Sequence, residues 1–470
     1  MQNKKQIILS IIAIVTLAIL VIGASFAYFA AQGNTSAQTS ATVKTYTVDV
    51  FSFENGDPIS FSLNQENFAS GKGNQTGSTF AKAILTANNK TNTATEHYNM
   101  YLNISENTFD YSIDENTPEI LLTITDGTNP VTNITSLTYK TVTDGKGNSI
   151  SGYDITNKTG LIELFSNREI TTTSTKTENW NISVTFINYN ADQSKNAGNT
   201  FSGKVLIQKE KITLLADYVI SQYTGTQGDN GIYYHESSLA NGAGDNSYRY
   251  AGASDSVNNY ICLGSDVATC PDANLFRIIG VFGDKTKVIR AKSVGDQRWQ
   301  ISKDNTWSSS SLNTYLNGTY LTSLGTLADK IATTTWKVGG GKTANINGVV
   351  PKTAYQYEVG SSASTTTYDA KIGLMYVSDY GFAADQSGWT TKLNSYNSNT
   401  SKNWLYLGHD EYTISRDSDT TGSAFIVYSG YVLSYLVNNA TNGVRPTFNL
   451  NSSVTYVSGD GTQSNPIRIN

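Results

Sequence analysis

The chain has 470 residues, so at roughly 150 residues per domain it should form two to four domains. Only 15% of its residues are charged, against about 25% in a typical soluble domain, and uncharged polar residues and 29 Tyr take their place. The net charge of -5 argues against a nucleic-acid partner, which needs a basic face, and three His and two Cys leave little material for zinc sites or histidine-based catalysis.

The first 31 residues contain a segment that can cross a membrane. Lys4 and Lys5 precede an uncharged apolar run over residues 7–31, which as a helix would be about 37 Å long. The two lysines predict that this end stays in the cytoplasm and that the rest of the chain is exported. Two interpretations stay open for residues 1–31. In one, the segment is a retained membrane anchor, and the rest of the chain lies on the extracellular face of the cell membrane. In the other, it is a signal peptide cleaved after Ala27, and the mature protein is secreted or lies at the cell surface.

Residues 23–29 (GASFAYF) resemble the signal segments of the camelysin and biofilm-fibre subunit group of Gram-positive bacteria. The exported domains of that group are β-sandwiches, so the resemblance implies a β-sandwich directly after the membrane segment. The resemblance rests on residues 23–29 and on the position of the predicted β-domain directly after the membrane segment.

An all-β domain is predicted over residues 43–210, behind a small polar linker at residues 32–42. From Tyr46 onward the side chains alternate with a period of two, and β-branched stretches are separated by Gly/Asn/Asp clusters such as residues 144–148 (DGKGN). About seven such stretches without a helical pattern predict a β-sandwich. The strands after the first are expected at residues 80–87, 98–104, 119–125, 160–165, 180–189 and 202–208.

A second, mixed domain is predicted over residues 212–470, after the charged boundary at residues 209–211. It should begin with a helix over residues 212–223, because the apolar side chains there follow helical spacing. A buried strand at 274–282 should form a hairpin with 287–291 across Gly283-Asp284. A helix at 308–317, capped by its serines, and a strand at 369–378 are also expected.

Four short motifs in this domain occur in a recognisable order: residues 311–317 (SLNTYLN), 372–378 (IGLMYVS), 404–406 (WLY) and 442–450 (NGVRPTFNL). In this order they resemble a widespread bacterial domain of unknown function with a C-type lectin-like fold, over about residues 260–470. The resemblance implies an α+β C-type lectin-like domain and an exported location, and it implies no established activity.

The polar and aromatic stretch at residues 381–421 is the predicted binding face. Long loops in compact domains are usually functional or disordered, and the aromatic residues here argue against disorder. Trp389, Trp404, Tyr406 and Tyr412 are the predicted ligand-binding residues. The alternative is that these side chains form a small core that holds the loop in place.

Cys262 and Cys270 are predicted to form a disulfide, because two nearby cysteines in an exported domain usually pair. Asp417 and Asp419 lie in a segment that matches the first half of a calcium loop, but its twelfth position is Tyr428 instead of Glu. An irregular calcium site at these two residues stays open, and no other metal or cofactor is predicted.

The function predicted from the sequence is surface binding or adhesion by an exported protein, which is not an enzyme. The N-terminal helix would contact the membrane, the β-sandwich would act as a spacer, and the C-terminal domain would bind a glycan or protein ligand. The alternative is a structural surface or fibre subunit that associates with copies of itself and has no soluble ligand.

Overall fold

The computed structural model describes residues 49–68, 71–88, 92–340 and 346–470. Strands account for 39% of the structure and helices for 18%, so the prediction of a β-rich protein is confirmed. The predicted membrane or signal segment, its cleavage site after Ala27 and the linker at 32–42 lie outside the described residues. Within the described ranges, no helix has the length and apolar character needed to span a membrane.

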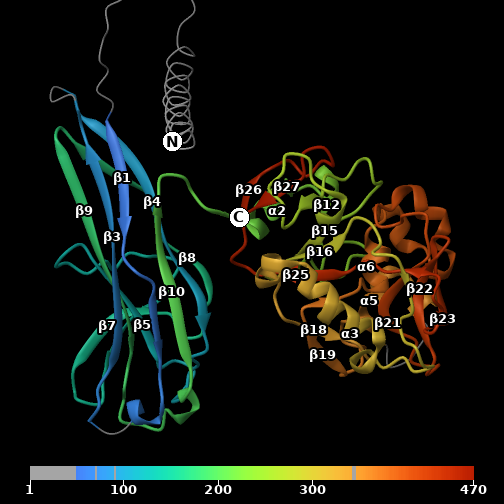
Figure 1. The fold of residues 1–470 in the computed structure, drawn as a ribbon, viewed down its shortest axis with the longest axis horizontal. Helices are drawn as coiled ribbons and strands as arrows, with labels where there is room; N and C mark the ends of the chain where they lie inside the picture. The colour runs from blue at the N-terminus through green and yellow to red at the C-terminus, as the bar shows by residue number, and fades with distance from the viewer. Residues whose placement is uncertain (1–48, 69–70, 89–91, 341–345) are drawn as a thin grey trace, which may run out of the picture. The chain divides into compact units, whose positions relative to one another are not determined.

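Two antiparallel sheets form the first β-rich part of the chain, drawn in blue to green in Figure 1. The six-stranded sheet has the order β1-β3-β9-β5-β7-β6, and the four-stranded sheet has the order β2-β10-β4-β8. The strands are β1 (Val50–Asn55), β2 (Ile59–Ser62), β3 (Gln75–Thr86), β4 (Ala94–Asn107), β5 (Ile120–Thr125), β6 (Tyr139–Thr143), β7 (Ser149–Asp154), β8 (Gly160–Thr172), β9 (Thr175–Phe186) and β10 (Thr200–Gln208).

The two sheets pack face to face over a main apolar core and a smaller cluster that includes Leu85, Tyr98 and Ile170. Side chains from both sheets meet in the main core, among them Leu102 of β4, Val205 of β10 and Val184 of β9. Alternate residues along each strand point inward, which is the pattern that predicted these strands. The short strands β2, β6 and β7 were not predicted individually, and the DGKGN cluster forms the turn between β6 and β7.

A ten-stranded sheet forms the centre of the second part, with β11-β26-β27-β14-β15-β16-β25-β20 as its main path. Strands β12 and β13 join it beside β15. The hairpin of β15 and β16 across Gly283-Asp284 confirms the sequence prediction. The strands are β11 (Thr213–Leu214), β12 (Ile232–Tyr234), β13 (Tyr248–Tyr250), β14 (Tyr260–Cys262), β15 (Leu275–Phe282), β16 (Lys285–Arg290), β20 (Ile372–Gly373), β25 (Thr447–Leu450), β26 (Thr455–Ser458) and β27 (Ile467–Ile469).

Two smaller sheets and several short helices complete this part (Figure 1). The five-stranded sheet has the order β17-β24-β21-β22-β23, and β18 pairs with β19. Their strands are β17 (Asp296–Gln297), β18 (Thr334–Lys337), β19 (Thr367–Ala370), β21 (Glu411–Arg416), β22 (Ser423–Tyr428), β23 (Tyr431–Leu436) and β24 (Asn442–Gly443). The α-helices are α2 (Leu215–Ser221), α3 (Ser311–Tyr315), α4 (Leu321–Ser323), α5 (Pro351–Glu358) and α6 (Val377–Phe382).

Two predicted elements differ from the structure. The helix expected at 212–223 is the shorter α2, because the residues before it pair with β26 as β11. The strand expected at 369–378 ends early and is followed by α6. The Asp379 carboxylate accepts a hydrogen bond from the backbone N–H of Tyr376 and so caps this helix, which local apolar patterning does not reveal.

The disulfide between Cys262 and Cys270 is present, as predicted. It closes a short loop whose backbone is also held from outside. Arg468 of β27 donates hydrogen bonds to the carbonyl oxygens of Ser265, Val267 and Ala268. The loop is therefore fixed by one covalent bond and one guanidinium group.

Candidate functional site

The aromatic residues predicted to bind ligand lie mostly in the core. Trp389 and Trp404 have no exposed surface, and Tyr412 is 1% exposed. The indole N–H of Trp389 donates to the carbonyl of Ala384 at 2.9 Å, and that of Trp404 donates to the carbonyl of Tyr250 at 2.8 Å. Of the four, only Tyr406 is half-buried. The buried rings of Trp389, Trp404 and Tyr412 hold the 381–421 segment against the core, and they are not accessible to a ligand in solvent.

The acidic residues proposed for calcium form part of a tight turn. The Asp417 carboxylate accepts hydrogen bonds from the Asp419 backbone N–H at 2.9 Å and the Thr420 hydroxyl at 2.7 Å, and also from the Ser434 hydroxyl. Among the described residues, no group of three or more His, Cys, Asp or Glu side chains is placed to hold a metal ion. The turn is stabilised by its own donors.

A different group of polar side chains lies in one row across the ten-stranded sheet. Arg249 of β13 pairs with Gly280 of β15, which pairs with Lys287 of β16, which pairs with Asn449 of β25. Residues directly opposite each other in antiparallel strands point to the same face. Gly280 lets the β13 backbone approach closely, because a Cβ at this position would lie only 2.1 Å from the carbonyl oxygen of Tyr248.

These residues line a pocket of about 220 Å³, here called the Lys287 pocket. Its walls come from β18, α5 and the start of α6, which contribute the rings of Trp336, Tyr355 and Tyr376. Thr335 is exposed and Lys337 is half-buried at its opening. The lining is Asp245, Arg249, Phe282, Lys287, Thr334, Thr335, Trp336, Lys337, Tyr355, Val359, Tyr376, Ser378, Asp379 and Asn449.

Charged side chains are buried in this pocket. The Lys287 ammonium lies 2.5 Å from the Asp379 carboxylate, and these side chains are 6% and 2% exposed. The Arg249 guanidinium lies 2.6 Å from Asp245 and 3.8 Å from Asp379. Burial lowers the pKa of Lys287, against the opposing effect of Asp379. Burial raises the pKa of Asp245, but the Arg249 charge together with hydrogen bonds from Ser247 and Arg249 lowers that pKa to about 2.

Aromatic rings surround the two cations. The Lys287 nitrogen lies 4.7 Å from the centre of the Tyr376 ring, and the Arg249 guanidinium lies 4.7 Å from that of Phe282. Taking charges out of water is costly even when they are paired, and apolar residues often replace such pairs without loss of stability. A buried charge network beside an open pocket is therefore a candidate binding site.

Glu358, at the end of α5, holds the start of α6. Its carboxylate accepts hydrogen bonds from the backbone N–H groups of Val377 at 2.9 Å and Ser378 at 2.8 Å, and from the Ser415 hydroxyl. The side chain is almost fully buried. Burial raises the pKa of Glu358 to about 7, although its hydrogen bonds oppose this.

The stability of the protein should depend on pH through Glu358. Its folded-state pKa of about 7 lies above the ordinary glutamate value of 4.5, so between these values the folded state binds a proton that the unfolded state does not. Stability therefore falls as pH rises across this window, by about 3 kcal/mol. Urea unfolding at about pH 5 and about pH 8 measures this difference, which Glu358→Gln should reduce. An unchanged difference in the variant would contradict the assignment.

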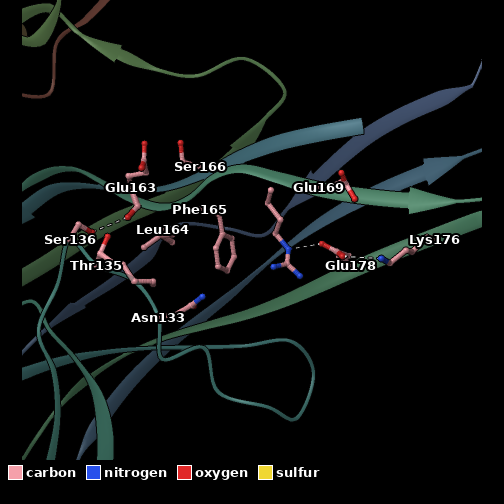
Figure 2. Close-up of a pocket in the computed structure, with 12 residues that line it drawn as sticks. Asn133, Thr135, Ser136, Glu163, Leu164, Phe165, Ser166, Glu169, Lys176 and Glu178 are labelled. Carbon is pink, nitrogen blue, oxygen red and sulfur yellow. Dashed lines mark hydrogen bonds and ion pairs between the residues drawn. The ribbon is translucent and has the colours of Figure 1, made fainter. Parts of the chain in front are cut away.

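A larger groove, of about 580 Å³, lies on the β-sandwich and is shown in Figure 2. Phe165 of β8 projects between Thr135 and Ser136 on one side and Lys176 and Glu178 on the other (Figure 2).

Apart from Glu178, which is 11% exposed, the charged side chains of this groove are largely exposed, and Arg168 and Lys176 both pair with Glu178. Arg168 donates to Glu178 at 2.8 Å, Lys176 lies 3.3 Å from Glu178, and the Tyr98 hydroxyl donates to Glu178 at 2.6 Å. The Arg168 guanidinium also lies 4.6 Å from the Trp180 ring. These contacts account for the network as a surface brace between β8 and β9. The Lys287 pocket, with its buried charges, is the better candidate.

Comparisons with protein-family models, with curated proteins and with solved structures find no match to this chain. The case for a site therefore rests on the residues themselves. Sequence reasoning missed Arg249, Lys287 and Asp379. One signal was available, because Lys287 begins the segment KVIR in the strand predicted to pair with the buried strand at 274–282, where an unpaired lysine would be costly.

Proposed function

We propose that this chain is an exported surface protein that binds a ligand, and that the ligand occupies the Lys287 pocket. The observation that supports this most is the burial of Arg249, Lys287 and Asp379 around an open cavity with aromatic walls. The pocket sits on a sheet, which holds its side chains more rigidly than a loop would. Binding in it would use hydrogen bonds and ring contacts, without a chemical step.

We further propose that the second part of the chain has a C-type lectin-like fold. Such domains bring their two ends together in a small sheet and leave a long irregular segment between them. Here β11 near the start of this part pairs with β26 near its end, at Thr213 and Tyr456. The 381–421 segment contains two 3-10 helices, Gln386–Thr390 and Leu393–Lys402, before β21 begins. Both features support the proposal, in which the β-sandwich serves as a spacer.

A binding screen of the full chain tests the proposed function. The probes are glycans, mucins and bacterial cell-wall material, each with and without calcium. The decisive variant is Thr335→Trp, because Thr335 is exposed at the opening of the pocket and a large ring there would block it. Its matched control is Thr333→Trp, which places the same ring at an exposed position outside the lining.

We expect saturable binding by the wild type and by Thr333→Trp, and a loss of at least about tenfold in Thr335→Trp. Binding that Thr335→Trp leaves unchanged would move the site elsewhere. If a folded sample bound none of the probes, this result would overturn the proposal. Assembly into filaments would then support the structural-subunit alternative.

A further inference from the structure

The charges that line the Lys287 pocket do not balance. The lining holds three cations, Arg249, Lys287 and Lys337, and two carboxylates, Asp245 and Asp379, so one positive charge is in excess. The excess belongs to Lys337 at the rim, which forms no ion pair with any carboxylate in the described ranges.

Two further acidic residues near the pocket are engaged elsewhere. Asp369 of β19 accepts a hydrogen bond from the Thr335 hydroxyl at 2.6 Å and does not line the cavity. Glu358 accepts the hydrogen bonds at the start of α6. The cavity itself is therefore positive, and a positive cavity with aromatic walls favours an anion.

The two buried cations also have unused donors. The Lys287 ammonium has three protons, and among the described residues its one hydrogen-bond acceptor is Asp379. Arg249 donates through Nε to Ser247 at 2.8 Å and through Nη2 to Asp245. Its Nη1 lies 3.8 Å from Asp379, beyond hydrogen-bond distance. An incoming pair of oxygen atoms could accept from both Lys287 and Arg249.

The size and walls of the cavity limit the rest of the ligand. Its volume of about 220 Å³ lies below the roughly 300–1,000 Å³ of sites for drug-sized ligands, so it suits a single ring. Trp336 and Tyr376 line it with aromatic rings, and Thr334, which carries a hydroxyl group, also lines it. One excess charge matches a monoanion better than a phosphate dianion.

We infer that the Lys287 pocket binds a monoanionic carboxylate carried on a single ring. The carboxylate would accept from Lys287 and Arg249, the ring would lie against Trp336 and Tyr376, and Lys337 would balance the charge. This inference rests on the proposed function, because it names the ligand class of the same pocket. A sugar acid and an aromatic acid share this chemistry.

Calorimetric titration of the full chain tests the inference with defined probes. Glucuronate and N-acetylneuraminate represent sugar acids, benzoate represents aromatic acids, glucose is the neutral match for glucuronate, and inorganic phosphate is the non-ring anion. Lys337→Glu reverses the excess charge at a half-buried rim position. Lys303→Glu is the matched control, since Lys303 is exposed in the same part of the chain and outside the lining.

We expect at least one ring carboxylate to bind saturably, at least about tenfold tighter than glucose or phosphate, and to bind more weakly at high salt. The preferred probe identifies the source as a sugar acid or an aromatic acid. Lys337→Glu should weaken binding at least about tenfold, and Lys303→Glu should leave it unchanged.

Four results would overturn the inference. Glucose binding as tightly as glucuronate would show that charge is not recognised, and an unaffected Lys337→Glu variant would show the same. Absence of binding by every carboxylate probe, together with a neutral ligand from the screen that Thr335→Trp blocks, would reject the ligand class and leave the proposed function standing. Failure of both the screen and the titration would reject both.

Discussion

Replacing Arg445 with methionine should lower the free energy of unfolding by about 3–5 kcal/mol. Arg445 lies in the VRP motif and is 2% exposed, as is Glu411 of β21. Its Nη2 donates to the Glu411 carboxylate at 2.7 Å and to the carbonyl oxygen of Leu405. Without the guanidinium, a carboxylate whose pKa burial already raises would stay in the core without its partner. Urea unfolding monitored by fluorescence measures the loss.

A double variant separates loss of the pair from loss of packing. Arg445→Met with Glu411→Leu removes both charges, so it should recover most of the stability that the single change loses. The control for an exposed pair is Lys292→Met, because Lys292 and Asp272 are 61% and 67% exposed and such pairs contribute at most about 1 kcal/mol. If Arg445→Met lost no more free energy of unfolding than Lys292→Met, this result would contradict the assignment of a stabilising buried pair.

Replacing Trp404 with alanine should also cost about 3–5 kcal/mol in the free energy of unfolding. The ring is fully buried, its N–H donates to Tyr250, and the Arg277 guanidinium lies 4.7 Å from its centre. The change would leave a cavity and an unpaired carbonyl, and it would remove one of the two aromatic contacts of the buried Arg277, whose other contact is Tyr260. Chemical unfolding measures the effect.

The neighbouring Tyr406→Ala is the control, since Tyr406 is half-buried and should cost less. A Trp404→Ala protein with unchanged stability and lost ligand binding would contradict the core assignment. It would instead restore the prediction that Trp404 belongs to a binding face.

The sequence predicts the strands well where burial alternates along the chain. β3, β4, β8 and β9 are long enough for that pattern to dominate, whereas β2 and β6 have only four and five residues, and long-range pairing decides them. Capping by Asp379 likewise turns the end of a predicted strand into α6. Alternating hydrophobicity therefore predicts long strands, but it does not predict elements that depend on distant pairing or on a capping side chain.

The candidate site could not be predicted in the same way. Trp389 and Trp404 stand in a polar stretch, so composition cannot tell whether they face ligand or core. In the core, Trp389 donates a hydrogen bond to the carbonyl of Ala384, and Trp404 donates one to the carbonyl of Tyr250. Tyr250 is far from Trp404 in the sequence, so a local pattern does not reveal this contact. The row from Arg249 to Asn449 depends on strand pairings that periodicity does not encode.

The row of paired residues across the sheet also sets when the pocket can form during folding. Its members span positions 249 to 449, and no shorter stretch of chain brings Arg249, Lys287 and Asn449 together. Sheets built from such distant pairings fold slowly, because large loops must close before the contacts stabilise them. The cavity is therefore a late product of folding, and a partly folded chain would have its secondary structure well before it could hold a ligand.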